Sequence, residues 1–153
     1  MAMRDRYNRF SDGQDISGNA GTNKNSTDVV DLSASGKDYK GNARVADPAS
    51  PGSRIVAIVT TALVAAADGC VLTVALYEHT AAASIDSGNL IMSEDHTVNT
   101  AGLAAGTKLM DRTIPYDKID ERYIALDYAI ATQNLSSGAV DAFISAGGEK
   151  RIP

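Results

Sequence analysis

The sequence of 153 residues contains no tryptophan, one cysteine and two histidines, and each scarcity excludes something. The single cysteine, Cys70, excludes a disulfide framework within the chain and agrees with folding in a reducing cytoplasm. No apolar run reaches the roughly 20 residues that a membrane-spanning helix needs. The first ten residues are polar and charged, without the apolar segment of a secretory signal peptide, so we expect no export by that route.

Basic and aromatic residues are also scarce. The chain has 14 Lys and Arg against 19 Asp and Glu, a formal net charge of −5, which disfavours a nucleic-acid binder because such proteins are usually basic. It favours solubility or a partner with a positive surface. With only two Phe and six Tyr, the core must consist of Val, Ile, Leu and Ala, and a sugar-binding platform has little aromatic material. We therefore expect no nucleic-acid and no membrane partner.

Candidates for chemistry are few. The two histidines are the only side chains with an unperturbed pKa near neutrality, and we expect both to be exposed, His79 at a strand end and His96 in a polar turn. Neither has a second histidine at metal-binding spacing, and no glycine-x-serine-x-glycine elbow is present. We expect Cys70 to be a small buried hydrophobe. These observations predict no enzyme, no metal and no cofactor, although a Ser-His-Asp triad assembled across the fold stays open at the level of sequence.

Short apolar runs separated by turn signals predict an all-β fold, either a sandwich or a barrel. Strict alternation places Ile124, Leu126, Tyr128 and Ile130 on the inner side of the clearest strand. A helix over residues 53–67 is disfavoured by its β-branched residues despite its alanines. Because Asp68-Gly69 is a turn signal, the runs on either side of it are expected to form an antiparallel hairpin. The strands expected after residue 53 are 54–64, 71–79, 89–93, a possible brief one at 96–99, 108–114, 122–132 and 139–145.

The sequence predicts one domain with an N-terminal arm, a long internal loop and a C-terminal tail. Residues 10–146 form the expected sandwich domain, preceded by a locally basic arm at 1–9 and followed by a polar tail at 147–153. Residues 33–53 are rich in Gly, Ser and Pro and are expected to form a long surface loop. Loops of this length in a compact domain are usually functional or partly disordered.

Three segments carry a family resemblance: Phe10-Ser11-Asp12-Gly13-Gln14, Ser26-Thr27-Asp28-Val29-Val30-Asp31-Leu32, and the strand that begins Arg122-Tyr123-Ile124. They resemble a family of tailed-phage capsid cement, or decoration, proteins typified by the cement protein of a Bordetella phage. Its members open with a phenylalanine-serine-aspartate-x-glutamine segment, followed by a serine-threonine-x-valine/isoleucine-aspartate-leucine strand. This chain departs from them in its longer arm and its longer, proline-bearing loop.

The resemblance implies a jelly-roll-like antiparallel β-sandwich that binds the outside of a phage head and cements adjacent major capsid protein subunits. It further implies synthesis in the host cytoplasm, a place on the capsid exterior, and self-association as a dimer or trimer. The arm and the loop supply the predicted contact residues, which are Arg4, Arg6, Tyr7, Arg9, Lys37, Tyr39, Lys40 and Arg44. Two alternatives remain, a carbohydrate-binding β-sandwich module and a low-copy head-completion or tail protein.

Overall fold

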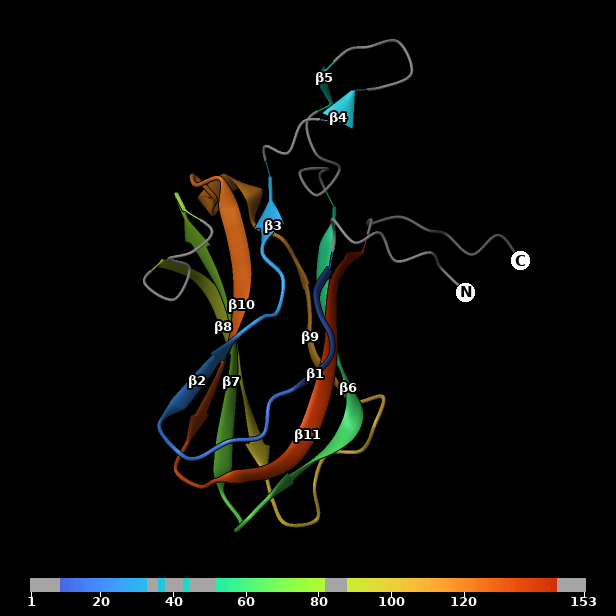
Figure 1. Cartoon of the computed structure of the whole chain (residues 1–153), viewed down its shortest axis with the longest axis vertical. Coiled ribbons are helices and arrows are strands. Elements are labelled where there is room, and N and C mark those ends of the chain that lie inside the picture. Colours follow the sequence, from blue (N-terminus) through green and yellow to red (C-terminus); the bar gives the residue numbers. More distant parts are fainter. Residues whose placement is uncertain (1–8, 33–35, 38–42, 45–51, 82–87, 146–153) are drawn as a thin grey trace, which may run out of the picture.

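Two antiparallel β-sheets packed face to face make up the protein (Figure 1). The computed structural model describes residues 9–32, 36–37, 43–44, 52–81 and 88–145. The strands are β1 (Arg9–Asp15), β2 (Thr22–Asn25), β3 (Val30–Asp31), β4 (Gly36–Lys37), β5 (Ala43–Arg44), β6 (Arg54–Ala65), β7 (Cys70–His79), β8 (Asn89–Val98), β9 (Lys108–Thr113), β10 (Tyr123–Ala131) and β11 (Leu135–Ser145). Among the described residues the only helical element is a 3-10 turn, Tyr116–Lys118.

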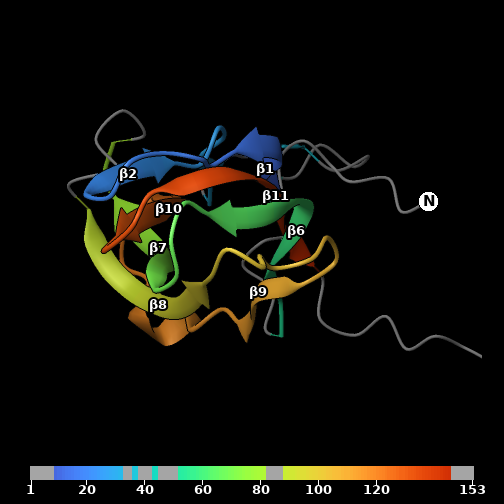
Figure 2. The same cartoon turned by 90° about the horizontal axis from the view of Figure 1, so that it is seen from below.

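The strand order identifies the sandwich as a jelly roll. One sheet runs β1-β11-β6-β9; the other runs β2-β10-β7-β8, and β3 also pairs with β10. If β3 and the separate β4–β5 pair are set aside, eight strands remain, and they pair first with eighth, second with seventh, third with sixth and fourth with fifth. This nested pairing, wrapped over two layers as Figure 2 shows, is the jelly-roll arrangement, so the predicted fold class is confirmed.

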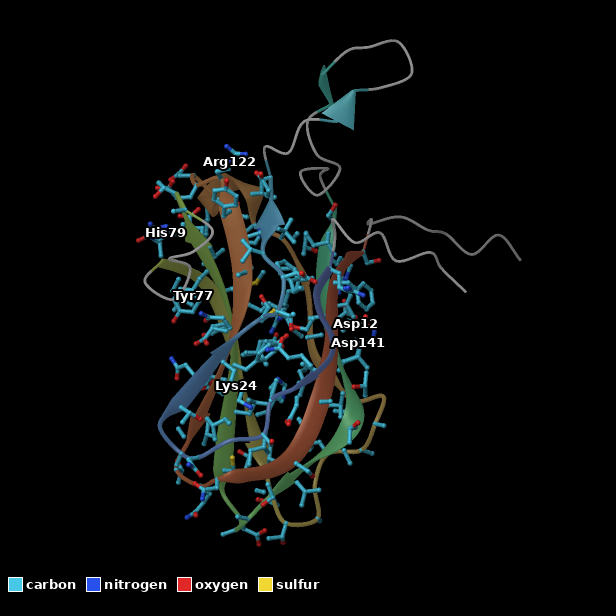
Figure 3. All side chains as sticks on the ribbon, viewed as in Figure 1. Asp12, Lys24, Tyr77, His79, Arg122 and Asp141 are labelled. Carbon is cyan, nitrogen blue, oxygen red and sulfur yellow. The ribbon has the colours of Figure 1, made fainter. Side chains whose placement is uncertain are left out.

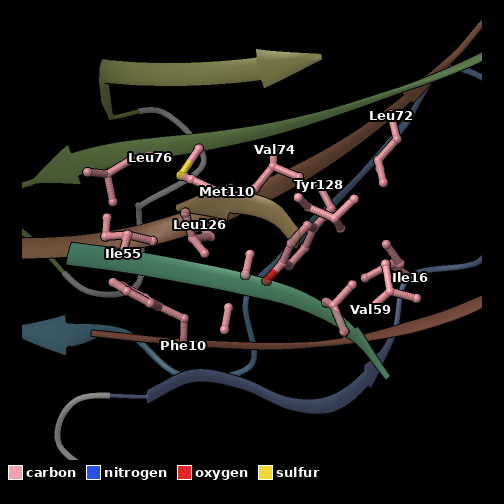
Figure 4. Close-up of a cluster of buried hydrophobic side chains, with 14 of the residues drawn as sticks. Phe10, Ile16, Ile55, Val59, Leu72, Val74, Leu76, Met110, Leu126 and Tyr128 are labelled. Carbon is pink, nitrogen blue, oxygen red and sulfur yellow. The ribbon is translucent and has the colours of Figure 1, made fainter. Parts of the chain in front are cut away.

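The core lies between the two sheets and is built by alternation along each strand (Figure 4). Ile124, Leu126, Tyr128 and Ile130 of β10 are all buried there, as the sequence predicts. The largest buried side chain is Tyr128, whose hydroxyl lies 2.8 Å from Ser11 Oγ. Burial in this apolar surrounding raises the pKa of the Tyr128 phenol far above its ordinary value, so the ring stays neutral.

Two expectations about neighbouring strands are wrong. Residues 54–65 and 70–79 are strands joined by a turn at Asp68-Gly69, but β6 and β7 lie in different sheets and form no hairpin. Both edges of β6 are occupied by the distant strands β11 and β9, so the turn has to cross between the layers. Gly69, with a φ of 87°, provides the left-handed backbone for that crossing.

The second error concerns His96. The expected polar turn around Glu94 and Asp95 is absent: β8 continues from Asn89 to Val98 and pairs with β7 along its length. Because β8 is an edge strand, polar side chains reach solvent from it without interrupting the pairing. His96 points toward the other sheet, half-buried, with its Nε2 2.5 Å from the carbonyl oxygen of Leu109.

The two ends of the sandwich differ. At one end, which we call the turn end, close hydrogen bonds hold the connections; Asp68 Oδ1 accepts from both the N–H and the hydroxyl of Thr100, each at 2.8 Å. At the opposite end, which we call the arm end, the described segments begin or stop (Figure 1). For the segments that form the two sheets, these boundaries are Arg9, Leu32, Gly52, Ala81, Gly88 and Ser145. The arm 1–9 and the loop 33–53 therefore join the sandwich at the same end, although they are separate in the sequence.

Candidate functional site

The predicted contact residues are placed only in part. Arg4, Arg6, Tyr7, Tyr39 and Lys40 lie outside the described residues. Lys37 and Arg44 lie in the small β4–β5 pair, opposite Ala43 and Gly36 respectively. The remaining residue is Arg9, which is the first residue of β1 rather than the last residue of the arm.

Arg9 is engaged within the sandwich. Its guanidinium forms an ion pair with Asp12, and its Nε lies 3.7 Å from Asp28 Oδ2. The neighbouring backbone is tied to the same segment, since the N–H of Asp28 donates to the carbonyl of Phe10 at 2.8 Å. Only 28% of the Arg9 side chain is exposed. The Arg9 guanidinium therefore holds β1 against the segment just before β3. Most of the Arg9 side chain is buried in these contacts.

The segments that carry the family resemblance contact one another. Ser11 Oγ donates to Gln14 Oε1 at 2.7 Å and also bonds the hydroxyl of Tyr128. Gln14 in turn donates to the carbonyl of Asn25 at 2.7 Å and accepts from the N–H of Thr27 at 2.9 Å. The opening phenylalanine-serine-aspartate-x-glutamine segment thus links β1 to β2 and, through Tyr128, to β10 of the opposite sheet.

The second and third segments form a matching pair of contacts. Ser26 and Leu126 exchange hydrogen bonds: the N–H of Ser26 donates to the Leu126 carbonyl at 2.7 Å, and its Oγ accepts from Leu126 N–H at 3.2 Å. Asp31 holds Arg122 through two bonds of 2.9 and 2.8 Å. These hydrogen bonds raise the pKa of Arg122, which stays charged. The segments that signal the family are therefore architectural, a role that sequence spacing alone did not indicate.

A buried carboxylate, missed by the sequence analysis, orders the loop that leads into β10. Glu78 is 4% exposed, and its Oε2 accepts from the N–H groups of Asp120 at 2.8 Å and Glu121 at 3.0 Å. The acidic stretch at 117–121 is thus anchored to β7 at the arm end through Asp120 and Glu121. The sequence did contain a signal for this buried carboxylate, because Glu78 is a charged residue within an alternating strand.

The outer side of the four-stranded sheet presents paired charges. Arg54 and Lys108 both bind Asp111, at 2.7 Å each, and their hydrogen bonds, that of Lys108 foremost, hold the pKa of Asp111 below its ordinary value. On the neighbouring strands, Asp141 accepts from the N–H of Gly13 at 2.6 Å, and Arg9 pairs with Asp12. Acidic and basic groups are balanced on this face and largely neutralise one another.

A pocket of about 530 Å³ opens between the edge strands β8 and β9. Its charged groups are already paired, Arg112 with Glu94 and Arg54 with Asp111. These pairs and the contact of His96 with Leu109 close the seam between the sheets, so the pocket presents no unbalanced charge to a ligand. Its lining is Arg54, Met92, Ser93, Glu94, Asp111, Arg112, Thr113 and Pro115.

The outer side of the five-stranded sheet is different. Near the arm end it carries Tyr77, His79, Leu90 and Tyr123, which we call the aromatic patch (Figure 3 labels Tyr77 and His79). Register places Tyr77 opposite Leu90 on one side, and Tyr123 opposite His79. Leu90 is 55% exposed, the single large hydrophobic side chain so exposed in the described part of the chain. Leu90 gives this face exposed apolar area among the residues that the structure describes.

Two further titratable groups are His79 and Cys70. His79 Nδ1 accepts from the N–H of Ala81 at 2.9 Å, so its proton, when neutral, is on Nε2. Cys70 is buried, as predicted, and burial raises the pKa of its thiol. Across the described residues, no three His, Cys, Asp or Glu side chains gather as metal ligands would. Within the same residues, no helix is long and apolar enough to cross a bilayer.

Comparison with known proteins identified one matching family model. The model of one protein family, Bbp16, matches residues 10–144. The match begins at Phe10 in β1 and ends in β11, so it covers both sheets of the jelly roll and includes all three segments described above. No curated protein matches the chain.

Proposed function

Because the chain belongs to the Bbp16 family, a family of Bordetella phage proteins, we propose that it is a structural protein of the virion. It binds the outer surface of a tailed-phage head and cements adjacent major capsid protein subunits. The observation that carries this proposal is the family match over both sheets of the sandwich. The arm end also supports the proposal, because the arm and the loop, which are both predicted to make contacts, are attached to the jelly roll at that same end.

Such a protein would bind the capsid through its surface and through the edge strands of its sheets. Among the residues that the structure describes, each sheet ends in strands with one edge that no further strand pairs with, β1 and β9 in one sheet and β2 and β8 in the other. An extended segment of another chain can add to such an edge through main-chain hydrogen bonds. Many modest contacts of this kind, repeated over a shell, become strong through multivalency. The mechanism requires no cofactor and no catalytic group.

The partners follow from the same proposal. The major capsid protein is the binding partner, and the protein self-associates as a dimer or trimer. It is made in the host cytoplasm and resides on the capsid exterior, without contact to nucleic acid or membrane. A net charge of −5 supports a partner with a positive surface.

The copy number of the protein in purified virions tests the proposal. A cement protein is present at the same order of copies as the major capsid protein, as gel densitometry of virions measures. A few copies per particle would instead identify a head-completion or tail protein. Retention of the protein on a glycan array, with no binding to heads, would identify a carbohydrate-binding module.

A second experiment addresses the predicted contact segments. Deletion of residues 1–8 leaves β1 complete and should weaken binding to heads if the arm makes contacts. Deletion within residues 38–42 asks the same of the loop and leaves the β4 and β5 residues present. Unchanged occupancy of both deletion variants on heads would remove these segments from the interface.

A further inference from the structure

The four edge strands of the two sheets differ in how far their outer main-chain groups are already occupied. β1 and β2 lie along one side of the sandwich, and β8 and β9 lie along the opposite side (Figure 2). Short strands, bulges and side-chain hydrogen bonds are devices that keep an edge from adding a further strand. They occur at β1, β2 and β9, whereas β8, the longest of the four, is regular from residue 92 to residue 98.

The side formed by β1 and β2 is sealed. β1 has two register shifts against β11, and the carbonyl of Phe10 accepts from the N–H of Asp28 at 2.8 Å. β2 has only four residues, and the carbonyl of its last residue, Asn25, accepts from Gln14 Nε2 at 2.7 Å. A strand added at either edge would have to displace these hydrogen bonds.

β9 is closed by side chains from its neighbours. The N–H of Ile114 donates at 2.9 Å to the carbonyl of the residue before β6, and the register with β6 then turns the main chain of Asp111 outward. The Asp111 carbonyl accepts from Arg54 Nη2 at 2.8 Å. Leu109 lies at the register shift of β9, and its carbonyl oxygen is 2.5 Å from His96 Nε2. The acceptors at the centre of this edge are therefore already used.

Hydrogen bonding across three strands identifies the outward groups of β8. The N–H of Ser26 donates to the carbonyl of Leu126, so even-numbered residues of β10 bond toward β2 and odd-numbered ones toward β7. The registers of β10 with β7, and of β7 with β8, then turn even-numbered residues of β8 toward β7. Ser93, Asp95 and Thr97 therefore direct their N–H and C=O groups away from the sheet. Among the described residues, none supplies a partner for these groups.

The acidic side chains of β8 leave this edge clear. Asp95 Oδ1 accepts from the hydroxyl of Thr73 at 2.6 Å, and Thr73 belongs to β7, on the side away from the free edge. Glu94 pairs with Arg112 of β9. Both carboxylates are thus held over the faces of the sheet. The edge between them offers main-chain donors and acceptors in the repeat that an extended chain matches.

The pocket between β8 and β9 lies on the side to which alternate side chains of an added strand would point. Met92 and Glu94 line it, and both face inward because they stand opposite the buried Leu76 and Val74. The charges of the pocket are already paired with one another. An uncharged side chain can enter without leaving a charge unpaired, whereas a charged one cannot.

A second copy of β8 is a poor match for this edge. In an antiparallel pair about a two-fold axis, the register that joins the whole stretch 92–98 sets Asp95 directly against its own copy. Like charges in that position destabilise a sheet. Registers that avoid the contact leave part of the stretch unpaired, so a strand of a different protein fits better.

We infer that an extended segment of the major capsid protein adds to the outer edge of β8. It bonds the main chain of Ser93, Asp95 and Thr97 and directs an uncharged side chain into the pocket beside β9. This inference rests on the proposed function and selects one of the four edges. In such strand additions, main-chain hydrogen bonds supply affinity and the pocket supplies selectivity.

Proline substitution tests the edge. At an outward position of an edge strand, proline removes a donor and blocks the added strand, while the bonds of β8 to β7 remain. Ser93→Pro and Thr97→Pro should each weaken binding about ten-fold, measured by co-sedimentation with heads assembled without this protein. Asn23→Pro is the matched control, because Asn23 has the corresponding outward position on β2, and its binding should equal that of the wild type. Circular dichroism checks the fold, and either β8 variant suffices if the other unfolds.

Hydrogen exchange tests the same edge without a substitution. The amides of Ser93, Asp95 and Thr97 should exchange fast in the free protein and about ten-fold more slowly on heads, followed by mass spectrometry of peptides from this stretch. Unchanged exchange on heads would overturn the inference. Slower exchange in the free protein as its concentration rises would identify a second copy as the occupant, and would overturn it as well.

Thr113→Glu tests the pocket. Thr113 is an exposed residue of its lining, so the substitution adds an unpaired charge without changing the core and should also weaken binding about ten-fold. Binding equal to that of the wild type, in folded edge variants or in the pocket variant, would overturn the inference and leave the proposed function standing. A wild-type protein that does not bind heads at all would overturn both.

Discussion

Gly138, in β11, is the position at which a single methyl group should damage the fold most. Its φ is 149°, in the region that favours glycine, and a Cβ there would lie 2.1 Å from Leu63 Cδ2 and 3.1 Å from Leu63 Cα. Leu63 is fully buried, so it has little room to move. The backbone strain costs about 1–3 kcal/mol. Overpacking of the core adds about 1–3 kcal/mol, so Gly138→Ala should lower the free energy of unfolding by about 2–6 kcal/mol in total.

Gly106→Ala provides the matched control. Gly106 has a φ of 89°, and no atom lies within 4 Å of the position that a Cβ would take there, so alanine meets strain without a clash. We expect that substitution to cost about 1–2 kcal/mol. Urea unfolding followed by circular dichroism measures both variants. If Gly138→Ala is as stable as Gly106→Ala within about 0.5 kcal/mol, close packing against Leu63 is not what fixes glycine at this position.

A double-mutant cycle separates the clash from the strain. Leu63→Ala alone should cost about 2–5 kcal/mol, because it empties a buried site. In the double variant the contact with Cδ2 is gone and only that with the Leu63 backbone remains. The double variant should therefore be more stable than the sum of the single effects predicts, by about 1–3 kcal/mol. Strict additivity would contradict the packing explanation.

Three further predictions concern single groups. Tyr128→Phe removes the buried hydroxyl bonded to Ser11 and should cost about 1 kcal/mol in urea unfolding, and no loss would mean that the bond contributes nothing. Hydrogen bonds from Thr100, that of its backbone foremost, lower the pKa of Asp68 from 3.8, so the stability from Asp68 is present above that pH and is lost as the pH falls through its lower folded value. Asp68→Asn should thus flatten the acid-induced loss of stability, measured as unfolding midpoints against pH, and a profile identical to the wild type would refute this role. The buried Cys70 thiol should react with a thiol reagent only after unfolding, and rapid labelling of the native protein would contradict its burial.

The sequence alone indicated most of the strands after residue 53 and the inward-facing side of the clearest one. Residues 122–132 alternate with a period of two residues, and the run from Ile55 to Thr61 is continuously rich in β-branched residues. Both signals are contained in full in a local pattern. The family resemblance added the jelly roll. Local pattern failed where a partner strand decides the outcome: at β8, pairing with β7 carried the strand through a polar stretch that appeared to be a turn.

Part of the candidate site can also be predicted from the sequence, and the rest depends on the tertiary structure. The basic arm and the long loop are visible in the sequence because their composition is unlike that of a strand, and their roles remain predictions. The aromatic patch is not visible there, since Tyr77, Leu90 and Tyr123 come from three strands and share one face only through the register of β7 with β8 and β10. Nor does the sequence reveal that Asp31 binds Arg122, 91 positions away.

The chain by itself therefore indicated most of the strands after residue 53, the inward-facing residues of the clearest one and the all-β class, because the alternation of side chains is a property of each segment alone. The tertiary structure decided which strands are neighbours, that β6 and β7 separate into two sheets, and that the described segments of these two sheets begin and stop at the arm end. Those outcomes depend on which backbone edges the distant strands occupy, and no local pattern contains that information. The surface proposed to meet the capsid is a product of the same long-range pairing.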